Sequence, residues 1–236
     1  MTKSAYLCLL AVVISAVPVA PLPAAAQGFK FSQPDESAKE DAAAEAARQA
    51  MIADQLSRPC RAELRGKKIM VIIGQVQSNG YIAAQQQNYG PHYQAINNRL
   101  QALGLRTYTP EEIRAQIKQA EIDAYFKNDP DAMLSASRRL GASFVLRGLI
   151  SSQATVNPMM PVNQVAVNMA FTLTTSGGRV VSDVQANNAS YAGTDVARMA
   201  LTLVNEKADE VVAQLYGDYC RNAAPPPAAR GAQKKQ

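Results

Sequence analysis

The sequence predicts an α/β (α+β) fold in which helices pack on a single mixed sheet with an antiparallel hairpin near its C-terminal end. A continuous apolar run at residues 69–73 is typical of a strand buried on both faces. Large apolar residues at alternate positions of 165–173 indicate an antiparallel strand with one exposed face. A long amphipathic segment after residue 194 predicts a helix that covers the sheet.

The first half of the predicted domain alternates strands and helices. After the buried strand, a helix at 91–103 begins at a proline and is followed by a C-cap glycine. Residues 105–108 form a short second strand. Thr109 is the expected N-cap of a helix at 110–120, because acidic residues fill its first turn. A third helix, at 130–140, again begins at a proline and ends at a glycine.

The second half places three strands in succession before the last helix. A buried strand at 142–150 precedes the alternating strand at 165–173. A glycine pair then permits a hairpin turn, and residues 180–188 return as the partner strand. Thr194 is the expected N-cap of the C-terminal helix. The predicted order is β-α-β-α-α-β-β-β-α, which implies one mixed sheet.

The chain divides into four expected segments. They are a signal peptide at 1–26, an Ala-rich helical or partly ordered lead-in at 27–59, a globular domain at 60–221 and a disordered Pro/Ala-rich tail at 222–236. In the first segment Lys3 precedes an apolar run, and small residues at 24–26 fit a cleavage site. A membrane anchor fits less well, since the run is short and ends in prolines. No cysteine follows the cleavage site, so we expect an exported, non-lipidated periplasmic protein with no transmembrane span.

Two cysteines, Cys60 and Cys220, remain after the signal segment and flank the predicted domain. An oxidising compartment permits a disulfide between them, and exported thiols seldom stay free. The alternative is a pair of free thiols near the domain ends.

Two stretches resemble a known superfamily. Residues 140–148 (LGASFVLRG) are similar to its helix-to-strand junction, and 167–181 (VNMAFTLTTSGGRVV) are similar to its hairpin. The superfamily includes the N-terminal domain of the Tol-Pal translocation protein, the curli secretion lipoprotein, the lipoprotein activator of a penicillin-binding protein and the flagellar assembly protein T. The resemblance covers about residues 67–217 and implies a noncatalytic interaction protein of the cell envelope. No spare pair of alternating segments suits a secretion pore.

The sequence favours no enzyme, metal or cofactor. It contains no G-x-S-x-G elbow, zinc spacing or nucleotide-binding loop, and its one histidine, His92, has no evident partner. Nucleic acid is not an expected ligand either. The formal net charge is only +5, there is no tryptophan, and the basic residues are dispersed along the sequence.

Two segments are candidate binding regions. The first is the loop at 75–89 after the first strand, rich in amide and tyrosine side chains that suit polar recognition. Its candidate residues, with the adjacent histidine, are Gln75, Gln77, Asn79, Tyr81, Gln85, Gln87, Tyr89 and His92. The second is a turn at 157–161, in which Met159 and Met160 form an apolar tip. The alternatives are a mobile connector and a tip folded back onto the domain.

These observations predict an accessory interaction protein of an envelope assembly or secretion machine. Its expected partners are envelope proteins, peptidoglycan-associated ones among them. Three other functions stay open: a receptor for a small ligand or glycan, an enzyme of unrecognised type that depends on His92, and a self-assembling ring subunit that forms a homo-oligomer.

Overall fold

The computed structural model describes residues 34–76, 82–83, 90–127, 129–156, 159 and 162–222. The predicted signal peptide at 1–26 and the tail after residue 222 lie outside them. The chain divides into two units, Met1–Asp41 and Ala42–Gln236. In the smaller unit the described residues belong to the start of helix α1 (Pro34–Leu56). The larger unit holds everything described below, including the rest of α1 from Ala42 onward.

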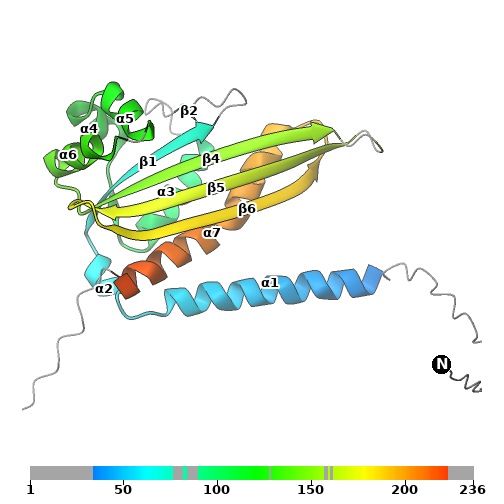
Figure 1. Cartoon of the computed structure of the whole chain (residues 1–236). Coiled ribbons are helices and arrows are strands. Elements are labelled where there is room, and N and C mark those ends of the chain that lie inside the picture. Colours follow the sequence, from blue (N-terminus) through cyan, green and yellow to red (C-terminus); the bar gives the residue numbers. More distant parts are fainter. Residues whose placement is uncertain are drawn as a thin grey trace, which may run out of the picture. The chain divides into compact units, whose positions relative to one another are not determined.

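The described strands form one mixed sheet (Figure 1). They are β1 (Lys68–Val76), β2 (Ile82–Ala83), β3 (Arg106–Thr107), β4 (Phe144–Val156), β5 (Asn163–Thr175) and β6 (Val180–Ala192). The order across the sheet is β2-β1-β4-β5-β6. The short strand β3 lies off this path and pairs with β1. Strands β1, β3 and β4 run parallel, whereas β4, β5 and β6 form an antiparallel meander. The predicted mixed sheet and its C-terminal hairpin are therefore confirmed.

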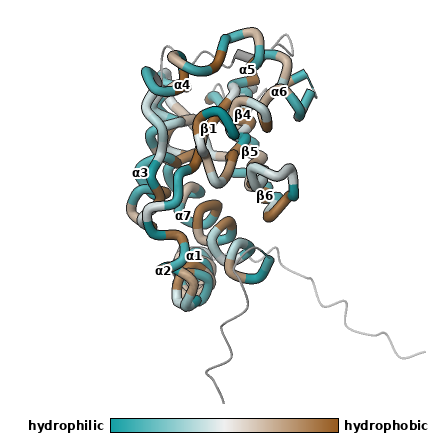
Figure 2. Tube along the Cα trace, turned by 90° about the vertical axis from the view of Figure 1, so that its left-hand side faces the viewer, coloured by the Kyte–Doolittle hydropathy of each residue, from teal (hydrophilic) through white to brown (hydrophobic). Residues whose placement is uncertain are grey.

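Helices cover both faces of this sheet. They are α2 (Arg61–Leu64), α3 (Pro91–Ala102), α4 (Pro110–Gln116), α5 (Gln119–Phe126), α6 (Pro130–Leu140) and α7 (Val196–Asn222). Helices α3 and α7 pack on one face, and α4, α5 and α6 pack on the other. Apolar and polar residues alternate along α7, as expected of an amphipathic helix (Figure 2). Arg99 of α3 also donates two hydrogen bonds to Asp209 of α7, which joins the two helices.

Strand β1 separates two hydrophobic cores. Ile69 and Val71 belong to the core under α3 and α7. Met70 and Ile72 belong to the smaller core under α4, α5 and α6. All four side chains are buried, because successive residues of a strand point to opposite faces. The continuous apolar run is thus a strand buried on both faces, as the sequence predicts.

Two local predictions were wrong. The helix expected at 110–120 is divided, because Ile117 adopts an extended conformation that buries its side chain. A new helix begins after Lys118, whose backbone N–H donates to the carboxylate of Glu121. The N-cap of α7 is Asp195 rather than Thr194, since the Asp195 carboxylate accepts from the backbone N–H of Arg198.

The disulfide between Cys60 and Cys220 is present, with the two Cα atoms 5.6 Å apart. It joins the start of α2 to the end of α7. Nearby, the hydroxyl of Tyr216 donates to the backbone carbonyl of Arg58. Ile52 of α1 is buried, so the second half of that helix packs as part of the larger unit.

Candidate interaction surface at the distal end of the sheet

The two predicted binding segments emerge from the same end of the sheet. Val76, the last residue of β1, pairs with Ser151 of β4. Strand β4 then continues for five residues beyond β1, to Val156. We call this protruding part of β4, with the facing parts of β5 and β6, the distal end. Parallel pairing of β1 with β4 therefore places the end of β1 at the base of the distal end (Figure 1).

Three of the sequence-predicted binding residues are described: Gln75, His92 and Met159. The others, Gln77, Asn79, Tyr81, Gln85, Gln87, Tyr89 and Met160, lie outside the described residues. Gln75 and His92 contact each other, whereas Met159 lies beyond the end of β4.

Exposed apolar side chains gather at the distal end. Over the part of the chain that the structure describes, seven large apolar side chains are exposed, and four of them lie here. Their exposed fractions are 67% for Val156, 90% for Met159, 36% for Val162 and 55% for Tyr191. We call these four residues the apolar tip. Tyr191 pairs with Gln164, the second residue of β5, so it lies beside the β4–β5 connection. Sequence reasoning found Met159 but missed Tyr191, which reaches the tip only through the register of β6.

A row of uncharged polar side chains continues from the tip along one face of the sheet. Helices α4, α5 and α6 cover this face only over β1 and the first part of β4, which leaves its distal part exposed. The exposed amides are Gln153, Gln164, Asn168, Gln185 and Asn187. Register places Ala166 between Gln153 and Ala189, so small residues alternate with the amides. The surface offers hydrogen-bond donors and acceptors with little charge. Its signal in the sequence was the exposed face predicted for the strand at 165–173.

Gln75 and His92 close the base of the loop. The Gln75 side-chain amide donates to His92 Nδ1 across 2.8 Å, which leaves the proton of the neutral ring on Nε2. Burial lowers the pKa of His92. Its Nε2 is buried and has no hydrogen-bond partner among the described atoms. This contact links the end of β1 to the start of α3.

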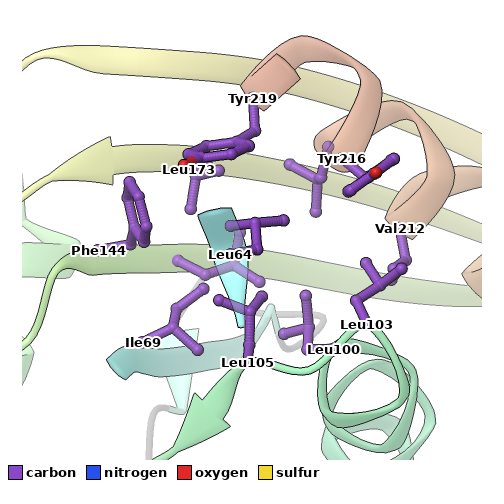
Figure 3. Close-up of a pocket in the computed structure, with 12 residues that line it drawn as sticks. Leu64, Ile69, Leu100, Leu103, Leu105, Phe144, Leu173, Val212, Tyr216 and Tyr219 are labelled. Carbon is purple, nitrogen blue, oxygen red and sulfur yellow. The ribbon is translucent and has the colours of Figure 1, made fainter. Parts of the chain in front are cut away.

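A small apolar cavity lies between α3, α7 and the sheet (Figure 3). Its volume is about 20 Å³, which is room for one water molecule. Leucine side chains form most of its wall, and Tyr216 and Tyr219 reach it from α7. A space of this size holds no organic ligand, so we assign it to core packing.

Neither a metal site nor a membrane span is found in the described ranges. No group of three or more His, Cys, Asp or Glu side chains there could hold a metal ion. No helix within those ranges is both long and apolar enough to cross a bilayer.

Comparison with known proteins gives likeness of fold. No protein-family model matches the sequence. No curated protein matches it either. Among solved structures, a PelC dodecamer from Paraburkholderia phytofirmans is similar at 16% identity and a TM-score of 0.38, over 64% of this chain and 88% of that chain. The LpoB C-terminal domain from Salmonella enterica is similar at 16% identity and a TM-score of 0.38, over 60% and 94%.

Lipoprotein GNA1162 from Neisseria meningitidis is similar at 12% identity and a TM-score of 0.39, over 62% of this chain and 98% of that chain. Each of these matches covers only part of this chain.

Proposed function

We propose that this chain is an exported, noncatalytic accessory protein that binds a protein of a cell-envelope assembly or secretion machine through its distal end. The gathering of exposed apolar side chains at the tip carries the proposal. The signal-like first segment of the sequence supports export to the periplasm.

A protein partner suits the chemistry of this surface. Side chains such as Met159 and Tyr191 are of the types enriched in interface cores, where flexible or aromatic groups lose water on contact. The amide row beside them provides the polar rim that interfaces carry. The strands below the tip are paired along their length, so the tip is presented on a rigid support.

The direct test is affinity capture from the host envelope with a tagged chain. A triple variant, Val156→Ser, Met159→Ser and Tyr191→Ser, removes the three most exposed side chains of the apolar tip without touching the core. Val180→Ser is the matched control, because Val180 is also exposed (57%) but lies at the opposite end of the sheet. The proposal expects one envelope protein to be captured and its recovery to fall about tenfold in the triple variant only. Equal recovery with both variants would contradict it.

A second function, glycan binding, has the amide row in its favour. Amide side chains pair with sugar hydroxyls, and Tyr191 supplies a ring beside them. Calorimetric titration with envelope glycan fragments separates the two functions. Saturable heat that disappears in Asn168→Ala and Asn187→Ala would favour the glycan.

A further inference from the structure

A second surface lies at the other end of the same strands. The carboxyl-terminal end of α6, the start of β4 and the β5–β6 turn line an open pocket of about 480 Å³. Three of its lining side chains are basic, namely Lys67, Arg138 and Arg179, and none is acidic. We call it the basic pocket. With 13 residues in β4, it lies about 40 Å from the apolar tip.

The three cations come from distant parts of the chain. Lys67 directly precedes β1, Arg138 is in the last turn of α6, and Arg179 is in the β5–β6 turn. Backbone pairing brings them together, because the N–H of Ser143 donates to the carbonyl of Lys68 and the N–H of Ser176 donates to the carbonyl of Ser143. These three basic residues are therefore dispersed along the sequence but lie close together in the folded chain.

Neutral contacts hold each cation in place. Arg138 Nε donates to the backbone carbonyl of Ser176 across 3.3 Å, and Arg179 Nη1 donates to the carbonyl of Asn222. The ammonium of Lys67 lies 5.8 Å from the ring centroid of Phe144 and 6.0 Å from that of Tyr219. These contacts leave further N–H donors of each group for a ligand.

No carboxylate neutralises these three cations within the described ranges. None of them forms an ion pair within 4.0 Å there. Asp218, on the last turns of α7, is occupied by Arg221 and by the hydroxyl of Ser182. The hydroxyls of Ser143, Thr175 and Ser176 belong to residues that line the same pocket. Several cations with neighbouring hydroxyls, and no competing acid, match the acceptors of a phosphate group.

We propose that the basic pocket binds a phosphate group, either on the headgroup of an anionic lipid or on a soluble phosphate compound. An alternative explanation is that these basic residues only stabilise the C-terminal ends of helices, but this does not account for all three. Arg138 is placed to stabilise the end of α6, and Arg179 bonds to the end of α7, whereas the ammonium of Lys67 lies against two aromatic rings. The inference is independent of the distal surface and of its partner.

The test compares two triple variants of equal charge. Lys67→Gln, Arg138→Gln and Arg179→Gln empty the pocket of cations. Arg114→Gln, Lys127→Gln and Arg198→Gln remove three exposed cations elsewhere. The full chain, purified as the cell makes it, is titrated with inorganic phosphate and pyrophosphate and followed by amide NMR shifts. It is also sedimented with vesicles of phosphatidylcholine containing about one third phosphatidylglycerol, with pure phosphatidylcholine as the blank.

The pocket variant is expected to lose at least tenfold in affinity, while the control variant stays within about twofold of the unmodified chain. Binding to anionic vesicles alone assigns the lipid source, and binding to free phosphate alone assigns the soluble source. Absence of binding in both arms, or equal losses in the two variants, would overturn the proposal. If the pocket variant unfolds, Arg138→Lys with Arg179→Lys keeps the charges, and binding must then persist.

Discussion

Two tyrosines of α7 have the same surroundings and different hydrogen bonding. Tyr216 and Tyr219 are both buried beside the apolar cavity (Figure 3). The Tyr216 hydroxyl donates to the carbonyl of Arg58, whereas the Tyr219 hydroxyl has no hydrogen-bond partner among the described residues. Loss of the hydroxyl from Tyr216 leaves a carbonyl unpaired, while loss from Tyr219 removes an unsatisfied polar group.

We therefore expect Tyr216→Phe to lower the free energy of unfolding by about 1 kcal/mol. Tyr219→Phe should leave it unchanged or raise it. Urea denaturation of both variants checks this, and each serves as the control of the other. A larger loss for Tyr219→Phe would show that its hydroxyl has a partner, such as a water in the cavity.

His92 makes stability depend on pH. Burial lowers the pKa of the folded-state imidazole below its ordinary value of 6.5, so the unfolded chain takes up a proton at a higher pH than the folded one. The free energy of unfolding should therefore fall as the pH decreases from 6.5 through the folded-state pKa. Asp209 and Glu121 also have lowered pKa values, from hydrogen bonds with Arg99 and the Lys118 backbone, but their ordinary values are 3.8 and 4.5.

His92→Gln should flatten this dependence between pH 7 and pH 5, because glutamine does not titrate and can still bond to Gln75. Urea midpoints at pH 7, 6 and 5 measure it. Parallel curves for the variant and the unmodified chain would show that the ring is not the group responsible.

At the level of elements, the packing of β4 beside β5 requires a residue without a side chain at position 148. Gly148 faces Phe171 across the β4–β5 pair, and a Cβ at position 148 would lie 2.5 Å from the phenyl ring. Phe171 is fully buried in the core. Gly148→Ala should therefore cost about 2 kcal/mol through overpacking. Gly193→Ala is the control, since a Cβ there meets nothing within 4 Å. Thermal unfolding that shows equal, small losses would contradict this account.

Elements with strong local signals could be predicted from the sequence. The apolar run of β1, the proline starts of α3 and α6, and the Thr109 capping box with Glu112 are each determined by neighbouring residues. The break in the helix at Ile117 could not be predicted from the sequence, because burial of that side chain overrides the helical spacing around it. The N-cap of α7 was missed by one residue, since Thr194 and Asp195 are both common N-cap residues.

The candidate surfaces depended on long-range pairing to a greater extent. Met159 was visible in the sequence as an apolar residue between prolines. Tyr191 joins it only because β6 pairs with β5 in one register. In the basic pocket, Lys67, Arg138 and Arg179 are separated by 71 and 41 positions along the chain. Only the parallel pairing of β1 with β4, and the return of β5, place them together.

At the scale of the whole molecule, one covalent bond closes the domain. The disulfide joins residues 160 positions apart, and in the chain-entropy description a loop of that length contributes about 5 kcal/mol. Cys60→Ala with Cys220→Ala should lower the free energy of unfolding by up to this amount. Unfolding in urea, with and without reductant, measures it. Reductant should destabilise the unmodified chain and leave the double variant unchanged, and a response from the double variant would contradict this assignment.

The same strands connect two surfaces of different chemistry. The apolar tip and amide row lie at one end of β4, and the basic pocket lies at the other. An accessory protein with this arrangement can hold a protein partner at one end and a phosphate-bearing ligand at the other. Binding of a protein at the apolar tip defines the proposed function.

Photo-crosslinking in the host tests that claim most directly. A photoreactive residue is placed at position 159 in one chain and at position 180 in another, since both positions are exposed and lie at opposite ends of the sheet. We expect one discrete crosslinked envelope protein from position 159, in a yield that Tyr191→Ser lowers, and none from position 180. The same products from both positions, or only crosslinks between copies of this chain, would contradict it.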